Sequence, residues 1–409
     1  MKLDNQSTVS QEPAAGHHAS HTKSKANIAM VTCGIVGLIG GAAMILAGVL
    51  MPKEGPRAIS YPNLPSVGAE EAKYLSPLTG MPVATAGDMT APTYCIQTPN
   101  GMDGARPQVG LNEAGVVFEA IAEAGITRFV AIYQNPRAAA IGPIRSLRLY
   151  YLQWDTPFDC TIVHAGGADD ALAAVKEGGY KDLSENYTYM YRSYGGSRAW
   201  NNLFTTGAYL ARVNTEWGYG ESQVNGFARM TPEESRRARI DGTVAEKLSI
   251  VKPAAGNTSA MAPRVSGAAV NFGGYDAFNV TYEYNAEANN YNRVYGTGEP
   301  AYVYVCPDED MGEPTPENVC SLSTMTPSVV VAMMVEEHKA EDNYHEDIAA
   351  IGSGEAYVFQ NGMMIHGTWN KASADAQIKF IDEKGTEIKL APGQTFVEAV
   401  PNYGSIASW

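Results

Sequence analysis

The stretch VFEAIAEAGITRF, residues 117–129, places Glu119, Glu123 and Arg128 inside an otherwise apolar run. It fits two interpretations: an Ala-rich helix that ends at Gly125 before a strand, or two strands that turn at EAG. In either case we expect Glu119 and Glu123 on one face, because a spacing of four residues suits both periodicities. A buried charge needs a partner. The run therefore predicts either a structural ion pair at the turn or part of a binding site.

Residues 77–250, which surround this stretch, alternate strand-like and helix-like segments, as is typical of an α/β (or α+β) domain. The segments that favour strands are RFVAIYQ and FDCTIVH, and those that favour helices are IRSLRLYYLQW, ADDALAAVKEG and TTGAYLARVNTEW. Residues 251–267 predict a linker. From 268 to 402 short strand-like runs follow one another, and Asn361-Gly362 between two of them predicts a hairpin. The fold class is therefore an α/β (or α+β) first domain with a smaller, mainly-β second domain.

The N-terminal region predicts a membrane anchor. Residues 26–52 carry no charged side chain, and about 20 apolar residues suffice for a transmembrane helix. The polar segment before this run is long, and the run itself exceeds the core of a cleaved signal peptide. We therefore expect an uncleaved signal anchor, with a single span, residues 1–25 as a disordered cytoplasmic tail and residues 53–76 as a tether.

The charge balance excludes one class of partner. The formal net charge is -15 at pH 7. Residues 1–52 carry three lysines against one Asp and one Glu, a net of +1, which leaves -16 for the rest of the chain. Such a surface repels phosphate backbones at long range, so no nucleic-acid partner is expected.

Four of the five cysteines fall as two pairs, Cys95 with Cys160 and Cys306 with Cys320, one pair in each predicted domain. Even pairs within a domain suit an oxidising compartment outside the cytoplasmic membrane. We predict a Cys306–Cys320 disulfide. Four buried thiols are the alternative interpretation.

The chain contains, in this order, the motifs SPLTGMP, ARPQVGLNEAGVVFEAIAEAGITRFVAIYQ, IGPIRSLRLYY, IVHAGGADDAL and NNLFTT, and then residues 351–401. This run of motifs resembles the YerB-like lipoprotein family, which is catalogued as a domain of unknown function. The resemblance covers most of residues 76–402 and implies an α/β domain, a smaller β-rich domain and an anchored location outside the cytoplasmic membrane. It implies no established activity. The chain departs from the family at two places: it has no lipobox, and Trp200-Asn201 stands where the family has Pro-His.

Three segments supply the remaining candidate binding residues. Arg145 and Arg148 follow Gly142-Pro143 and are expected on one face of a helix, where their charge opposes the macrodipole and calls for an anion. His164 ends a strand before a Gly-Gly turn, a usual position for ligand contacts in α/β folds. A loop contributes the residues Arg198, Asn201 and Asn202 beside Trp200.

We expect these residues to converge with Glu119, Glu123 and Arg128 on one polar cleft. For each, the alternative is a structural role. An aromatic and amide-rich lining suits sugars or peptides, so the prediction is an envelope protein that binds cell-envelope glycan or peptide. The alternative is a hydrolase that uses Glu119 or Glu123 with His164.

Several familiar sites are missing from the sequence, which has no HExxH, CxxC, GxSxG or EF-hand loop. His338 and His345 lie in an acidic segment that is typical of a solvated loop. No metal or cofactor is therefore expected, and catalytic residues remain unknown.

Overall fold

The computed structural model describes residues 72–193, 200–239, 264–308 and 320–409, and all of them belong to one compact unit. The predicted tail, span and tether at 1–25, 26–52 and 53–76 lie outside the described residues, apart from the last few residues of the tether. Among the described residues no helix has both the length and the apolar character needed to cross a membrane.

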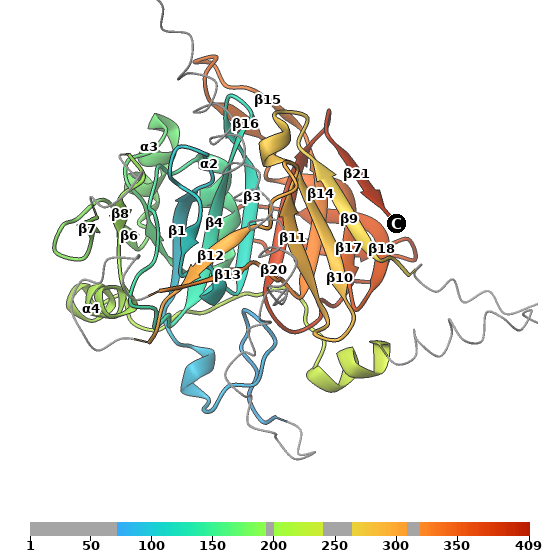
Figure 1. The fold of residues 1–409 in the computed structure, drawn as a ribbon. Coiled ribbons are helices and arrows are strands. Elements are labelled where there is room, and N and C mark those ends of the chain that lie inside the picture. The colour runs from blue at the N-terminus through green and yellow to red at the C-terminus, as the bar shows by residue number, and fades with distance from the viewer. Residues whose placement is uncertain (1–71, 194–199, 240–263, 309–319) are drawn as a thin grey trace, which may run out of the picture. The chain divides into compact units, whose positions relative to one another are not determined.

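A ten-stranded mixed sheet is the centre of the structure (Figure 1). In sheet order its strands are β19 (Lys379–Asp382), β18 (Met363–Lys371), β17 (Gly352–Gln360), β14 (Val329–Val335), β20 (Thr395–Pro401), β3 (Val116–Glu123), β4 (Ile126–Gln134), β1 (Thr93–Pro99), β5 (Thr161–Val163) and β6 (Asp182–Leu183). Strand β20 pairs in parallel with β3. The predicted domains 77–250 and 268–402 therefore share one sheet, and their predicted linker lies largely outside the described residues.

Smaller sheets pack around this one. A four-stranded sheet contains β11 (Asn290–Tyr295), β10 (Val280–Asn285), β9 (Gly267–Asn271) and β21 (Ser405–Ser408), and a three-stranded sheet contains β13 (Ser321–Thr324), β12 (Tyr302–Val305) and β2 (Gln108–Val109). Two-stranded pairs are formed by β15 (Glu337–Lys339) with β16 (Glu346–Ile348) and by β7 (Tyr191–Arg192) with β8 (Leu203–Phe204).

Three α-helices lie between residues 149 and 217: α2 (Leu149–Asp155), α3 (Asp169–Gly178) and α4 (Gly207–Trp217). Short 3-10 helices are η1 (Gly87–Met89), η2 (Leu111–Glu113), η3 (Thr156–Phe158) and η4 (Asp276–Phe278). The first half of the described chain is thus mixed α/β, and the described part from residue 264 onward is mostly β. This agrees with the predicted fold class.

Alternating residues of β3 and β4 face two hydrophobic cores, as the strand period of two requires. Val117 and Phe129 belong to the core that includes the four-stranded sheet. Phe118 and Val130 belong to the core that includes α2 and α3. The ten-stranded sheet is therefore a central layer that is covered on both faces, and a charged side chain on either face needs a built-in partner.

The hairpin predicted at Asn361-Gly362 is confirmed. Both residues have positive φ angles, 55° and 69°, and they connect the antiparallel strands β17 and β18. The helices predicted at 168–178 and 205–217 also form, as α3 and α4. One of the strand-like runs between 268 and 402, TEIKL at residues 386–390, forms no strand, because only isolated bridges at Glu387 and Leu390 occur there.

Candidate functional site

The stretch 117–129 forms an antiparallel hairpin, so its interpretation as two strands is correct. Ala124 and Gly125 turn the chain with φ angles of 49° and 76°, and the Gly125 position favours a residue without a Cβ. The pairing shifts between Ile121 and Glu123. This β-bulge inserts one residue and reverses the alternation of faces that follows it. Our expectation that Glu119 and Glu123 share a face is therefore wrong.

Glu119 lies in a fully buried charge network between the two β-layers. Arg293 of β11 donates to Glu119 and, at 2.9 Å, to Glu398 of β20, and all three side chains have 0% exposure. Tyr282 donates to the same Glu398 oxygen. Burial raises the pKa of Glu398 well above its usual range, and the neighbouring Glu119 raises it further. The direction of this shift favours the neutral form of Glu398, beside the buried ion pair of Arg293 with Glu119.

Glu123 lies on the opposite face and joins two arginines. Arg128 Nη2 donates to Glu123 Oε1 at 2.7 Å, and Arg148 Nη2 donates to Glu123 Oε2. Arg128 also donates to the Ser146 carbonyl at 2.8 Å. Burial lowers the pKa of Arg128, the nearby Arg148 lowers it further, and Glu123 opposes both effects. Glu123 therefore holds two mutually repelling guanidinium groups at the end of the hairpin.

Arg145 and Arg148 do not share a helix face, contrary to the prediction. Helix α2 begins at Leu149, and Arg148 precedes it in an extended conformation, with φ -128° and ψ 152°. Both arginines therefore belong to the connection between β4 and α2. Arg148 remains next to the helix N-terminus, where the macrodipole disfavours a cation, and Glu123 supplies the compensating negative charge.

The Arg145 guanidinium is held at one nitrogen and open at the other two. Its Nε donates to Asn201 Oδ1 at 2.9 Å, and Asn201 Nδ2 donates to the Asp103 carbonyl at 3.2 Å. The described residues provide no acceptor for the two Nη atoms of Arg145. Burial lowers the pKa of Arg145, and Asp103 partly offsets this. The side chain is thus fixed in place with two donors available.

These arginines line a cleft of about 790 Å³, which we call the arginine cleft. Five of the predicted residues meet there: Glu123, Arg128, Arg145, Arg148 and Asn201. The lining contains three arginines against two carboxylates, Glu123 and Asp103, so it carries a net positive charge in a strongly acidic protein. Its size is within the usual range of ligand sites, roughly 300–1,000 Å³.

The other predicted residues lie elsewhere. Glu119 is behind the wall of the cleft, where Thr127 and Asn100, two of the lining residues, donate to its Oε1. His164 is buried, contacts the Gly166 carbonyl and Asp182, and lines a different cavity. Asn202 accepts from Arg192. Arg198 lies outside the described residues.

Sequence reasoning missed the residues that the second half of the chain contributes. Tyr275, Phe278, Tyr344 and His345 line the arginine cleft, together with Met102 from the first half. Tyr275 and Tyr344 are exposed and lie outside any strand or helix, so no periodic pattern identifies them. Arg293 was also missed. Like Glu119, it is a charged residue within a segment whose pattern favours a strand, so the same signal was present.

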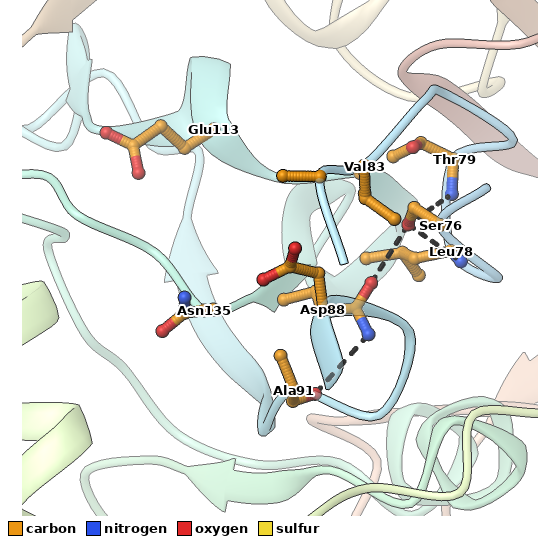
Figure 2. Close-up of a pocket in the computed structure, with 11 residues that line it drawn as sticks. Ser76, Leu78, Thr79, Val83, Asp88, Ala91, Glu113 and Asn135 are labelled. Atoms are coloured by element: carbon orange, nitrogen blue, oxygen red, sulfur yellow. Dashed lines mark hydrogen bonds between the residues drawn. The ribbon is translucent and has the colours of Figure 1, made fainter. Parts of the chain in front are cut away.

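A second cavity, of about 310 Å³, lies near the start of the described chain (Figure 2). Its polar groups are already used locally. Ser76 donates to Gln134 and accepts from the backbone of Leu78, and Glu113 accepts from the backbone N–H groups of Arg137 and Ala138. This cavity therefore offers less for a ligand than the arginine cleft.

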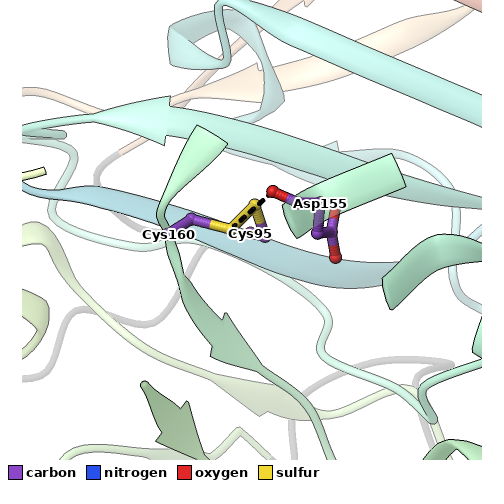
Figure 3. A group of neighbouring side chains, drawn as sticks. All are labelled: Cys95, Asp155 and Cys160. Atoms are coloured by element: carbon purple, nitrogen blue, oxygen red, sulfur yellow. Dashed lines mark hydrogen bonds between the residues drawn. A yellow bond between two sulfur atoms is a disulfide. The ribbon is translucent and has the colours of Figure 1, made fainter. Parts of the chain in front are cut away.

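The structure joins Cys95 to Cys160 and Cys306 to Cys320. Cys95, Asp155 and Cys160 are close enough together to suggest a metal site, but the two sulfurs are bonded to each other (Figure 3). Burial raises the pKa of Asp155 well above its usual range. With no free thiolate, and with a carboxyl whose burial disfavours the charged form, this group does not fit a metal ion.

Comparisons with known proteins agree with this architecture. Two family models match the chain, the N-terminal domain of "Protein of unknown function (DUF3048)" at residues 78–219 and its C-terminal domain at residues 268–397. "Putative lipoprotein YerB" of Bacillus subtilis (strain 168) is 24% identical over 340 residues, which are 81% of this chain and 87% of that protein. The crystal structure of the YerB protein from Bacillus subtilis matches with a TM-score of 0.62 and 21% identity, over 82% of this chain and 100% of that one. The chain belongs to the DUF3048 family, and its two matched regions correspond to that family's N- and C-terminal domains.

Proposed function

We propose that this protein binds an anionic component of the cell envelope, a glycan or a peptide, through the arginine cleft. The observation that carries the proposal is Arg145, whose Nε is anchored by Asn201 while its two Nη atoms have no acceptor among the described residues. A fixed guanidinium with a free pair of donors matches the two oxygens of a carboxylate or phosphate.

The neighbouring charges support this role for Arg145. Arg128 and Arg148 are both committed to Glu123, so they add a positive field without competing for the ligand. The rest of the protein is strongly acidic and disfavours anions at other positions on its surface. Selectivity for this cleft follows from that contrast.

The location of the protein supports an envelope ligand. The relative from Bacillus subtilis has the name of a lipoprotein, which suits a protein held at the membrane surface. In this chain we propose that the apolar run at 26–52 is the anchor and that the described residues lie outside the cell. The two half-cystine pairs fit an oxidising compartment.

No observation favours the hydrolase alternative. Glu119 is fully buried, Glu123 has both oxygens in ion pairs, and His164 lines another cavity. The three groups therefore do not meet around one reacting bond.

Co-sedimentation of the full-length protein, in detergent, with purified envelope polymer tests the proposal. Arg145→Met should reduce retention at least tenfold. Arg137→Met is the matched control, because Arg137 is 69% exposed, pairs with Asp308 and follows the opposite end of β4. The proposal would be contradicted if the polymer retained Arg145→Met and Arg137→Met equally. It would also be contradicted if the polymer retained neither the variants nor the wild-type protein.

A further inference from the structure

The rim of the arginine cleft carries large apolar side chains that face solvent. Met102, Tyr275 and Tyr344 are 69%, 63% and 58% exposed, and all three line the cleft. They come from three distant segments of the chain. A single exposed aromatic residue is ordinary, but three around one cavity mark an interaction surface.

Two of these side chains, Tyr275 and Tyr344, contact neighbouring residues. The Tyr275 ring packs against Gly125, where an added Cβ would lie 3.6 Å from the ring. The Tyr344 ring contacts His345 edge-on, with 5.0 Å between the ring centroids. The rim therefore offers two aromatic faces beside the polar floor around Arg145.

A peptide strand finds little to pair with in this cleft. Strand β3 lies between β20 and β4, and β4 lies between β3 and β1, so the backbone edges at the cleft belong to interior strands. At the end of β3, Glu123 already forms a bridge with His345. Addition of a peptide strand to a sheet edge, a common mode of peptide binding, is therefore blocked there.

We infer that the ligand is a saccharide that carries a carboxylate group. This inference rests on the proposed function of the arginine cleft and names the chemistry that the cleft selects. The carboxylate is bound by the two Nη donors of Arg145, as a planar fork fits a planar carboxylate. The apolar C–H face of a pyranose ring packs on Tyr275 and Tyr344, whose hydroxyl groups stay accessible to sugar hydroxyls.

Calorimetric titration of the full-length protein in detergent tests the inference with small probes. The acid probe is the trimer of galacturonic acid, and the matched neutral probe is its methyl ester. The peptide probe is N-acetyl-trialanine, which has a carboxylate but no sugar. We expect the acid trimer to bind at least tenfold more tightly than the ester or the peptide.

Variants separate the two parts of the site. Arg145→Met should lower the affinity for the acid to that for the ester, and leave the ester unchanged. Tyr275→Ala and Tyr344→Ala should each weaken both sugars. Tyr302→Ala is the control, because Tyr302 is also partly exposed but does not line the cleft.

Three outcomes would overturn the inference: equal binding of acid and ester, preference for the peptide, or no binding of either sugar. If the envelope polymer is still retained through Arg145 in those cases, only the assignment of a carboxylated saccharide fails. If that retention is absent as well, the proposed function fails with it.

Discussion

Replacing Arg293 with methionine removes the cation that lies between two carboxyl groups in the interior of the protein. The Arg293, Glu119 and Glu398 side chains have 0% exposure, so water cannot replace the lost ion pair. Loss of one partner of a buried pair costs about 3–5 kcal/mol. Arg293 is the ion-pair partner of both Glu119 and Glu398, so we expect the variant to lower the free energy of unfolding by about 3 kcal/mol or more.

Glu398→Gln is the matched control for this prediction. Glutamine has the shape of a protonated glutamate, and its carbonyl oxygen can still accept from Tyr282 and Arg293. It should cost less than about 1 kcal/mol, within the range of a single neutral hydrogen bond. Urea unfolding followed by tryptophan fluorescence measures both free energies. The reasoning would be refuted if Arg293→Met were nearly neutral or if Glu398→Gln cost as much.

Three further predictions follow from the same structure. Burial raises the pKa of Glu337 to about 7, so ionisation of this carboxyl disfavours the folded state. Its contribution to the free energy of unfolding, at most about 3 kcal/mol, is therefore present below pH 4.5 and is lost as the pH rises to about 7. Unfolding measured across this range should show that slope in the wild type and not in Glu337→Gln. Arg148→Met should lower the free energy of unfolding by about 1–3 kcal/mol, since Arg148 is buried and paired with Glu123, whereas Arg145→Met should change it by less than about 0.5 kcal/mol. Equal melting temperatures of Arg148→Met and Arg145→Met would contradict this difference. Protease added to intact cells should degrade the part of the chain after residue 52, and protection until lysis would reverse the proposed orientation.

Local patterns predicted much of the fold. The apolar periodicity of 168–178 and 205–217 and the Asn361-Gly362 turn each specify a structure within a short window. The helix expected over 144–154 was too long, because it begins at Leu149. Its arginines precede the helix and point to the cleft, which the periodicity of the apolar residues does not reveal.

The pairing of distant strands and the β-bulge in β3 could not be predicted from the sequence. Strand β20 pairs with β3 across about 280 residues of chain, and no local signal specifies that partner. The bulge near Ala122 adds one small apolar residue to a run of similar residues. Its effect is large, since it sends Glu119 and Glu123 to opposite faces.

The candidate site was predicted in part for a physical reason. Charges inside apolar runs identified Glu123, Arg128, Arg145 and Arg148, because each such charge needs a partner. The same rule could not distinguish a partner in the cleft from one in the core. Glu119 therefore looked like a member of the cleft, although its partner is Arg293.

A crystal structure of the protein with bound envelope fragments tests the central claim most directly. We predict an anionic group of the ligand within hydrogen-bond distance of the two Nη atoms of Arg145, with Asn201 still bound to Nε. A ligand held in another cavity, with the Arg145 Nη atoms left without a partner, would contradict the account.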